Sequence, residues 1–600
     1  MTDTLSTRAV PPLGAFVTDE GVTFRLWTTT ASEARVVLYH DDGRSDPRPL
    51  RFAGNGVFEG TFEDVRDGAR YKFELDGQAY PDPYARWLPD GVHGPAVVWT
   101  STTAFRHAAP PSRPGDLVIY EVHVGTFTPE GTYRAATEKL PHLRALGVTC
   151  VELMPLSSFP GERGWGYDGV AHFAPFAPYG PLEDLRTFVD EAHALGLRVI
   201  LDVVYNHFGP DGNYLYAYSP EYFTSEHKTP WGDALNYSNP FMRRLALDSA
   251  EHWLRTFGFD GLRLDATHEI HDEHPPHFLS ELAAHVRAVG DELGTRPVLF
   301  CEDDRNLPDL VTTFGMNGAW ADDFHHQVRV LLTGERDGYF ACYRPVVSDL
   351  ARCIERGWLY EGQTWPLGEP RPRGASARAL PASSFVYCIQ NHDQIGNRAL
   401  GDRLQATAGE DGFLMASALL LFLPMTPLLF QGQEWMAATP FQYFSDHAGE
   451  LGRLVTQGRL AEFGAFEAFN DPDAATRVPD PQARSTFENS KLDWSELERS
   501  EHARVLTLYR ALLRLRRDDP VLAHASRDAL EAGASDEVLW VQRTHAEDRR
   551  VLLVNFSGAP VAWTDVRGVP LDDLQPLLST SSTAQNHLPA KSAVLLAPKR

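Results

Sequence analysis

The sequence predicts an α/β protein whose centre is a (β/α)8 TIM barrel, flanked by an N-terminal β-sandwich and a small C-terminal β domain. From Leu117 onward, short continuous apolar runs alternate with amphipathic helices. Continuous apolar strands are typical of a parallel sheet that helices cover on both faces. We count eight such runs over about 400 residues, the number that closes a barrel. Before and after this region apolar residues alternate with polar ones, as in antiparallel sheets.

The predicted barrel strands lie, in chain order, within LVIYEVHV, VTCVELMPL, RVILDVVYNH, FDGLRLDATH, PVLFCEDD, AWADDF, SSFVYCIQNHDQ and TPLLFQGQEW. Between the second and third strands, apolar residues from Leu182 to Leu195 recur at helical spacing, and Gly196 is predicted to cap that helix. A doubly wound parallel sheet would show the same alternation. No GxGxxG motif opens the first helix, however, so the barrel is the preferred fold.

The flanking regions have a different pattern. GVTFRLWTT, ARVVLYH and RYKFELDG predict an all-β region, and the Pro-rich stretch 107–114 predicts a linker. After a helix predicted over 500–519, EVLWVQRT, RRVLLVNFS and SAVLLAP again predict short strands. We therefore predict three domains, which are an immunoglobulin-like β-sandwich over 1–110, the barrel with its insertions over 111–522 and a β domain over 523–600.

The composition narrows the range of partners and compartments. Acidic residues outnumber basic ones, 81 to 55, which gives a formal charge of −26. Such a chain repels phosphate backbones and anionic lipids, so we expect neither nucleic acid nor a membrane as a partner. The five cysteines show no CxxC spacing, and the N-terminus lacks the basic start and apolar segment of a secretory signal. We therefore expect a cytoplasmic protein without a disulfide framework or a structural zinc site. The oligomeric state stays open.

Four carboxylates follow predicted barrel strands directly: Asp202, Asp265, Glu302 and Asp393. Residues at these positions meet at the C-terminal face of a barrel, where active sites are built. Any one of them could instead cap a helix or form a loop salt bridge. Four together are costly unless they are used, because like charges in a cleft raise each other's pKa values. Converging carboxylates with aromatic residues nearby, and with no cofactor motif, suggest cleavage of a glycosidic bond without a cofactor.

Sugars also need flat aromatic platforms, and several aromatic residues follow the same strands. Trp165, Tyr167, Tyr205 and Trp231 all lie in these loops. Most aromatic side chains pack in cores, so each one alone is more often structural. Tyr167 is the clearest platform, because the glycines of GWGYDG predict a tight loop that presents its ring. We predict that Trp231 also contacts the substrate.

Four motifs carry a resemblance to a known group of enzymes. DVVYNH (202–207), GLRLDATH (261–268), CEDD (301–304) and QNHDQ (390–394) resemble, in the same order, the four sequence regions of the α-amylase superfamily. The resemblance covers the barrel and extends to both flanking β regions. It implies a glycosidase that retains the anomeric configuration through a covalent glycosyl-enzyme.

The resemblance also implies roles for individual residues. Asp265 corresponds to the nucleophile, Glu302 to the general acid/base and Asp393 to the stabiliser of the transition state. Arg263 would orient the nucleophile. A retaining mechanism then implies that the carboxyl groups of Asp265 and Glu302 lie about 5–5.5 Å apart.

The same resemblance places Asp202, His207 and His392 around the sugar at subsite −1. For the two histidines a structural role at a strand end is the alternative. His123, in YEVHVGTF, could be either a site residue or a core residue, and the sequence leaves both roles open. In many amylases the positions of Asp202 and Asn206 belong to a calcium site or are structural. This sequence shows no DxDxDG-type loop of oxygen ligands, so we predict no required metal.

Within the superfamily, the run from Glu162 to Leu215 is most similar to the malto-oligosyltrehalose trehalohydrolase family. The N-terminal GVTFRLW region is similar to the module that precedes the barrel in branching, debranching and trehalose-releasing enzymes. The resemblance implies hydrolysis of the α-1,4 bond next to the terminal trehalose of malto-oligosyltrehalose. It also implies functional pairing with a malto-oligosyltrehalose synthase.

The leaving-group side departs from the common amylase pattern. Many amylases have Lys-His three and four residues after the nucleophile, whereas this sequence has His268 and Glu269. We expect both to contact the part of the substrate beyond the cleaved bond. Asp303 and Asp304, and likewise Asp322 and Asp323, follow predicted strands and could reach substrate hydroxyls. Of these we predict Asp304 and Asp323 as substrate contacts, with a solvated acidic rim as the alternative.

Two other functions remain open from the sequence. A glucan branching or isoamylase-type debranching enzyme would use the same fold and the same acids. A non-catalytic glucan-binding scaffold on an inactive barrel is a second alternative. It is disfavoured because the counterparts of nucleophile, acid and stabiliser are all present.

Overall fold

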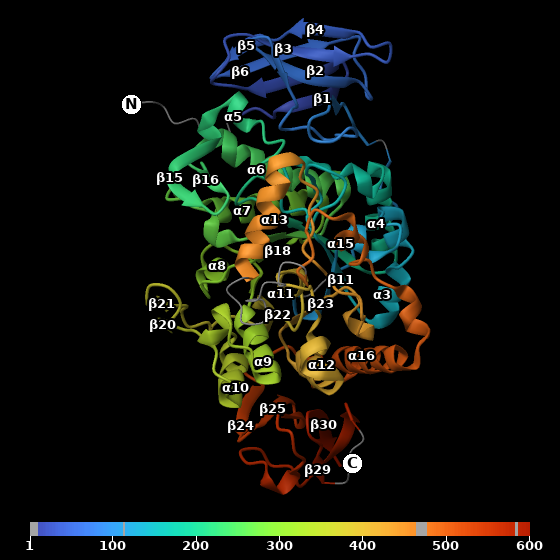
Figure 1. The fold of residues 1–600 in the computed structure, drawn as a ribbon, viewed down its shortest axis with the longest axis vertical. Helices are drawn as coiled ribbons and strands as arrows, with labels where there is room; N and C mark the ends of the chain where they lie inside the picture. The colour runs from blue at the N-terminus through green and yellow to red at the C-terminus, as the bar shows by residue number, and fades with distance from the viewer. Residues whose placement is uncertain (1–9, 102, 112–113, 464–476, 582–585, 600) are drawn as a thin grey trace.

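The computed structural model describes residues 10–101, 103–111, 114–463, 477–581 and 586–599. Three units follow one another along the long axis of the molecule (Figure 1): an N-terminal pair of sheets, a central barrel and a C-terminal sheet. Of the predicted linker 107–114, residues 112 and 113 lie outside the described residues. Within the described part of the chain, none of the helices is both long and apolar enough to cross a membrane.

The central unit is a closed barrel of eight parallel strands within the described residues. They are β10 (Ile119–Val122), β11 (Cys150–Leu153), β14 (Arg198–Val203), β17 (Gly261–Leu264), β18 (Val298–Cys301), β19 (Gly318–Trp320), β22 (Phe385–Cys388) and β23 (Thr426–Phe430). Each strand coincides with or overlaps one of the predicted apolar runs. The predicted fold class is therefore confirmed.

Helices surround the barrel strands and bury their apolar faces against them. The longer ones are α4 (Leu182–Ala194), α6 (Pro240–Phe257), α7 (Phe278–Leu293), α9 (Asp322–Thr333), α10 (Val347–Arg356), α12 (Leu404–Phe422), α13 (Gly449–Phe463) and α16 (Ser500–Asp518). In α4 the apolar positions predicted from the spacing are buried. The cap of α4 is Leu195, and Gly196 follows it in the left-handed conformation with φ 73°. Gly196 therefore lies one position after the cap, where its left-handed conformation ends the helix.

Shorter helices and hairpins fill the loops around the barrel. The helices are α1 (Val124–Phe127), α2 (Tyr133–Thr137), α3 (Leu140–Leu146), α5 (Leu215–Tyr218), α8 (Asp309–Thr312), α11 (His392–Gly396) and α15 (Arg484–Glu488). The hairpins are β12 (Ser157–Ser158) with β13 (Ala171–Pro175), β15 (Phe223–Thr229) with β16 (Gly232–Leu235), and β20 (Gln363–Trp365) with β21 (Arg371–Arg373).

The N-terminal unit is a sandwich of two antiparallel sheets. One contains β1 (Gly14–Thr18), β2 (Gly21–Trp27), β6 (Val57–Phe62) and β5 (Arg51–Gly54). The other contains β4 (Ser45–Pro49), β3 (Ala34–Tyr39), β7 (Arg70–Leu75), β8 (Gln78–Tyr80) and β9 (Ala96–Val97). Inside it, the rings of Phe24 and Tyr71 pack edge to face at 4.9 Å. Trp27 stacks on Phe241 of α6 at 4.1 Å, so the sandwich packs directly on a barrel helix.

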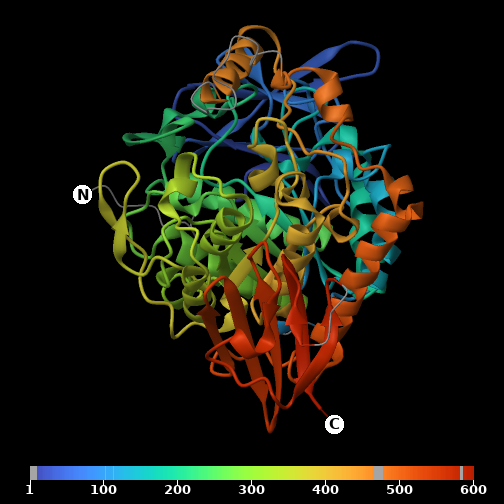
Figure 2. The ribbon, with the colours of Figure 1, turned by 60° about the horizontal axis from the view of Figure 1, so that its bottom comes forward.

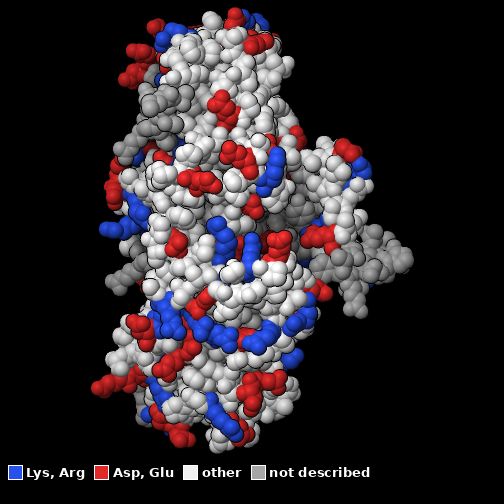
Figure 3. All heavy atoms as spheres, turned by 90° about the vertical axis from the view of Figure 1, so that its left-hand side faces the viewer, with Lys and Arg blue, Asp and Glu red and all other residues white. Residues whose placement is uncertain are grey.

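The C-terminal sheet has the order β24 (Leu530–Ser535), β25 (Val538–His545), β26 (Asp548–Asn555), β30 (Ser592–Pro598) and β28 (Leu574–Ser579), and a small pair of β27 (Val561–Ala562) with β29 (His587–Leu588) lies beside it. Figure 1 shows this sheet below the barrel, and Figure 2 shows it from the underside, in front of the barrel. It packs against α10 and α12. The buried Arg543 donates hydrogen bonds to the carbonyls of Phe422, at the end of α12, and Leu522. On the face drawn in Figure 3, basic and acidic side chains lie among one another rather than in separate patches.

Candidate active site

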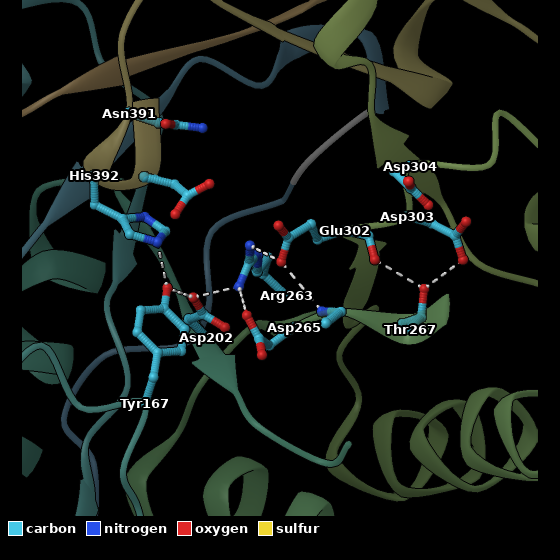
Figure 4. Close-up of polar contacts among 12 residues, drawn as sticks. Tyr167, Asp202, Arg263, Asp265, Thr267, Glu302, Asp303, Asp304, Asn391 and His392 are labelled. Carbon is cyan, nitrogen blue, oxygen red and sulfur yellow. Dashed lines mark hydrogen bonds and ion pairs between the residues drawn. The ribbon is translucent and has the colours of Figure 1, made fainter. Parts of the chain in front are cut away.

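The ends of four barrel strands bring the predicted carboxylates to one place. Asp202 lies within β14, Asp265 directly follows β17, and Glu302 directly follows β18. Asp393 lies in the first turn of α11, after β22. Figure 4 shows the first three acids around Arg263, with His392 and Tyr167 beside them. The convergence expected for the C-terminal face of a barrel is therefore present.

Arg263 is the centre of this cluster. Its Nη1 donates to Asp202 Oδ2 at 2.7 Å and to Asp265 Oδ1 at 3.0 Å, and its Nη2 donates to Glu302 Oε2 at 2.6 Å (Figure 4). The side chain is fully buried, and its guanidinium lies 4.1 Å from the ring centre of Trp320. A guanidinium stays charged and donates in a rigid plane. One cation therefore both orients three carboxylates and compensates part of their charge.

Asn206 gives Asp265 a second support. Its Nδ2 donates to Asp265 Oδ2 at 2.8 Å and to the Asp265 carbonyl at 2.7 Å. Together with Arg263, it engages both oxygens of the Asp265 carboxylate. The sequence presented Asn206 as a calcium-site or structural residue, so this contact was missed. The signal that could have identified Asn206 as a site residue is its position within the motif DVVYNH.

The backbone turns sharply after Asp265. Ala266 adopts a left-handed conformation with φ 37°, which costs a non-glycine residue about 1–2 kcal/mol. The turn lets the Ala266 N–H donate to Glu302 Oε2 at 3.1 Å. The N–H and the hydroxyl of Thr267 both donate to the Glu302 carbonyl at 2.9 Å. The strained turn thus fixes Glu302 beside Asp265.

The pKa values of two of these acids are raised. Burial raises the pKa of Glu302; Arg263 opposes this, while repulsion and a hydrogen bond with Asp265 raise the pKa further. Burial likewise raises the pKa of Asp393, with His392 opposing and Glu302 adding to the rise. A carboxyl group kept protonated beside an ionised one is the arrangement that acid-assisted glycoside cleavage requires.

Asp202 completes the set of acids. Burial raises the pKa of Asp202 to about 7 against the attraction of Arg263. Its Oδ2 also accepts a hydrogen bond from the Tyr167 hydroxyl at 2.6 Å, and that hydroxyl lies 2.8 Å from Nε2 of His392. The rings of Tyr167 and His392 stack at 5.1 Å. Tyr167 is only half-buried, so the residue predicted as the platform lies in the site.

The other aromatic residues separate into exposed and core positions. Trp231, in the turn between β15 and β16, is 46% exposed and stacks on the His207 ring at 3.8 Å. Trp165 is buried against Phe441, and Tyr205 is buried with its hydroxyl bonded to Ser249. Trp231 therefore remains available to a ligand, whereas Trp165 and Tyr205 belong to the core.

The histidines differ in the same way. His392 Nε2 lies 2.8 Å from the Tyr167 hydroxyl, and its Nδ1 lies 2.6 Å from Oε1 of Glu121 in β10. His207 is 4% exposed; Nε2 is 2.9 Å from the Tyr167 carbonyl, and burial lowers its pKa to about 4. Its Nδ1 contacts Asn206, so both nitrogens face protein groups, as in the structural alternative. His123 is also buried, with its nitrogens bonded to Thr126, the Gly164 carbonyl and Tyr179.

His268, Glu269 and Asp304 lie together at a partly open edge of the site. His268 Nδ1 is 4.0 Å from Asp304 Oδ1, and His268 Nε2 is 4.0 Å from Glu269 Oε1. His268, Asp303 and Asp304 offer possible metal-ligand atoms within 4.8 Å of one another. The Asp303 carboxylate, however, already pairs with Arg305 at 2.6 Å and accepts from Thr267. That pairing competes with a cation, and the predicted absence of a required metal stays a prediction.

The position of Asp323 does not agree with the prediction that it contacts substrate. It is fully buried, and its oxygens accept from Tyr343 Oη at 2.6 Å, Leu359 N at 2.7 Å and Asn306 Nδ2 at 2.8 Å. These bonds anchor the segments that follow β18, α9 and α10 rather than a sugar. Its neighbour Asp322 faces the site instead: burial and repulsion from Glu302 and Asp393 raise its pKa to about 7. The sequence identified the pair but selected the buried member.

Comparisons with known proteins agree with this geometry. The model of the alpha-amylase catalytic domain matches residues 78–229, and that of carbohydrate-binding module 48, the isoamylase N-terminal domain, matches residues 12–87. A malto-oligosyltrehalose trehalohydrolase of Deinococcus radiodurans is 53% identical over 96% of this chain and 94% of the relative. One of Rhizobium sp. is 39% identical over 96% and 97%.

A solved structure extends the likeness to three dimensions. A crystal structure of a Salmonella typhimurium protein provisionally assigned as an alpha amylase matches with a TM-score of 0.89 at 36% identity. The match covers 98% of this chain and all of the other, 100%. Because relatives matched over nearly the whole of both chains are 39% and 53% identical to it, the chain belongs to the malto-oligosyltrehalose trehalohydrolase family, glycosidases of the alpha-amylase superfamily.

Proposed function

We propose that the protein hydrolyses the α-1,4 bond next to the terminal trehalose of malto-oligosyltrehalose, with retention of the anomeric configuration, and releases trehalose and a maltodextrin. The observation that carries the chemistry is the contact of one buried guanidinium, Arg263, with both Asp265 and Glu302. It supports a nucleophile and an acid close enough for a retaining mechanism. The choice of substrate follows the names of the relatives.

In the first step Glu302 donates its proton to the glycosidic oxygen while an oxygen of Asp265 attacks the anomeric carbon. The C–O bond to trehalose breaks, and a covalent glycosyl-enzyme forms. In the second step Glu302, now a carboxylate, takes a proton from water as that water attacks the same carbon. The bond to Asp265 breaks, and both residues return to their starting states. Asp393 stabilises the positive charge that develops on the sugar.

The remaining predicted contacts divide around the cleaved bond. Tyr167, Asp202 and His392 lie with the acids and would hold the sugar at subsite −1. His268, Glu269 and Asp304 share one partly open edge and would meet the leaving trehalose. Trp231 would stack on a sugar further along the glucan, and His207 would support the opposite face of the Trp231 ring, on which it stacks.

The proposal includes the setting of the enzyme. A substrate that ends in trehalose must be made from a maltodextrin, so we propose a malto-oligosyltrehalose synthase as the functional partner and the cytoplasm as the location. We also propose the domain limits 1–110, 111–522 and 523–600. They are supported by the last N-terminal strand, which ends at Val97, and the first strand of the C-terminal sheet, which begins at Leu530.

Product analysis tests the proposal. The purified protein is incubated separately with maltotetraosyl-trehalose and with maltohexaose, and the sugars are separated. Free trehalose from the first, with little cleavage of the second, is the expected result. Comparable attack on maltohexaose would indicate a general amylase, branched products would indicate a branching enzyme, and binding without any product would indicate a scaffold. Each of these three results contradicts the proposal.

A further inference from the structure

A hydrogen-bonded chain runs from the first barrel strand into the active site. It links Glu121 of β10, His392 of α11, Tyr167 and Asp202. We propose that Glu121 is a positioning residue that holds His392 as a doubly protonated imidazolium, and that this cation favours the ionised forms of Asp202 and Asp393. The protonation of His392 concerns the protein alone; the effect on the acids rests on the proposed function, in which an ionised Asp393 stabilises the positive charge on the sugar.

Glu121 contacts His392 through both of its carboxylate oxygens. Its Oε1 lies 2.6 Å from His392 Nδ1, and its Oε2 accepts from the His392 backbone N–H at 2.8 Å. Glu121 is 0% exposed and His392 is 3% exposed. A carboxylate that accepts from a backbone N–H and faces a ring nitrogen requires Nδ1 to carry a proton.

The other end of the ring requires a second proton. His392 Nε2 lies 2.8 Å from the Tyr167 hydroxyl, which has one proton of its own. That proton points to Asp202 Oδ2 at 2.6 Å, an oxygen that also accepts from Arg263 at 2.7 Å. With Asp202 ionised, its Oδ2 can only accept, so Tyr167 donates to it. Tyr167 must then accept from Nε2, so both nitrogens of His392 are donors.

The groups around His392 fit this charge. Burial disfavours a charged imidazole, but attraction to Glu121 and the hydrogen bond that Glu121 accepts outweigh burial and raise the pKa of His392 to about 9. Asp393, on the same helix, adds to this rise, and Arg263 opposes it. The rings of Trp165 and Trp320 pack against His392. His123 also faces it, and burial lowers the pKa of His123 to about 4, so His123 adds no charge at neutral pH.

The cation acts on the acids that the mechanism needs. Burial raises the pKa values of both Asp202 and Asp393, and in both cases His392 lowers them. A cation within about 4–6 Å lowers the pKa of a carboxyl group by roughly 1–3 units. Loss of the charge on His392 would therefore let these buried acids take up protons at a higher pH.

The neighbouring strand provides a matched control. Glu152 of β11 pairs in register with Glu121 and is also 0% exposed. Neither of its oxygens has a hydrogen-bond partner within the described residues. Burial, with repulsion from Glu121 and Asp202, raises the pKa of Glu152 far above its usual value. Glu152→Gln therefore changes a carboxyl group at the same depth in the barrel without removing the partner of His392.

The first test measures His392 itself. Protein with 15N-labelled histidine is titrated by NMR, and the His392 signals are assigned by their absence from a His392→Gln variant. We expect both ring nitrogens of His392 to be protonated at pH 8 in the wild type and in Glu152→Gln. In Glu121→Gln we expect the ring to be neutral at pH 8, with partial recovery in Glu121→Asp. A neutral His392 at pH 7 in the wild type would overturn the proposal even if no variant folded. An unchanged cation in folded Glu121→Gln would overturn it too.

The second test measures the pH dependence of kcat/KM on maltotetraosyl-trehalose. In Glu121→Gln we expect the acidic limb of the profile to move up by about 1 pH unit or more, because Asp393 protonates at a higher pH. In Glu152→Gln the limb should stay in place. If kcat/KM of Glu121→Gln fell by the same factor at every pH, the result would contradict the electrostatic role of Glu121 and leave only a structural one. Because the NMR readout needs no substrate, failure of the proposed reaction and failure of this inference give different results.

Discussion

Asn206 holds Asp265 by two atoms of the same residue: its amide donates to the carboxylate at 2.8 Å and to the backbone carbonyl at 2.7 Å. Side chain and main chain of the proposed nucleophile are thus fixed relative to each other. The neighbouring left-handed turn at Ala266 then brings an N–H to Glu302. The geometry of the acid and the nucleophile is therefore set by short-range contacts within the loops that follow β14 and β17.

Asn206→Ala should lower kcat by about 10- to 100-fold, because a hydrogen bond to a charged group is worth about 1.5–3 kcal/mol. Tyr205→Phe is the control, since its hydroxyl bonds to Ser249 at 3.0 Å and, among the residues that the structure describes, to none of the site. Steady-state kinetics on maltotetraosyl-trehalose measure both variants. Equal kcat values for Asn206→Ala and the wild type would show that Arg263 alone orients Asp265.

Asp265→Ala should abolish turnover and leave the fold intact. Loss of covalent catalysis typically costs more than about 1,000-fold in rate. The measurement is trehalose release over long incubation, with circular dichroism as the check of the fold. If a folded variant retained more than a thousandth of the wild-type rate, Asp265 would not be the nucleophile.

Glu302→Gln should change the pH dependence of stability. Burial raises the pKa of Glu302, so the folded protein binds a proton that the unfolded chain has released above its own pKa of about 4.3. The wild type therefore loses stability as pH rises from that value through the folded pKa, and the glutamine variant does not. The melting temperature of the variant relative to the wild type should be higher at pH 8 than at pH 4.5. A constant difference would contradict the raised pKa.

Trp231→Ala should raise KM roughly 2- to 10-fold with little effect on kcat, because an aromatic contact is worth about 0.5–1.5 kcal/mol. Tyr216→Ala is a matched control: Tyr216 is also 46% exposed and stacks on Phe223 of the same hairpin. Kinetics with substrates of increasing chain length measure the effect. If both variants changed KM equally, the hairpin rather than the Trp231 ring would be responsible.

Asp322→Asn and Asp323→Asn should have opposite consequences. Asp323→Asn removes the buried acceptor of several hydrogen bonds and the partner of Arg373, so it should lower the free energy of unfolding by about 2–4 kcal/mol. Asp322→Asn should leave stability nearly unchanged and alter kcat or its pH profile, because Asp322 faces Glu302. Urea denaturation and kinetics distinguish them. The reverse pattern would assign Asp323 to the site.

The sequence predicted the barrel well because strands buried on both faces leave a plain signal of continuous apolar residues. It also predicted which acids meet, since residues that follow parallel strands share one end of the barrel. Glu121 was missed for a physical reason. It lies inside the apolar run LVIYEVHV, and no periodicity shows that its partner, His392, is 271 residues away.

The choice between Asp322 and Asp323 failed for a related reason. Both residues begin α9, where successive side chains point in different directions around the axis. The packing of the segments after α9 and α10 decides which one is buried, and it depends on residues such as Tyr343 and Leu359. Such long-range contacts leave no local pattern in the sequence.

The burial of Arg263 has a consequence for the ionic strength that the enzyme can tolerate. Dissolved salt screens charges that contact solvent, but it reaches buried pairs much less. The guanidinium is 0% exposed, and Asp202 is 1% exposed. Added salt should therefore weaken the many surface ion pairs of this acidic chain well before it weakens the contacts that orient the reacting groups.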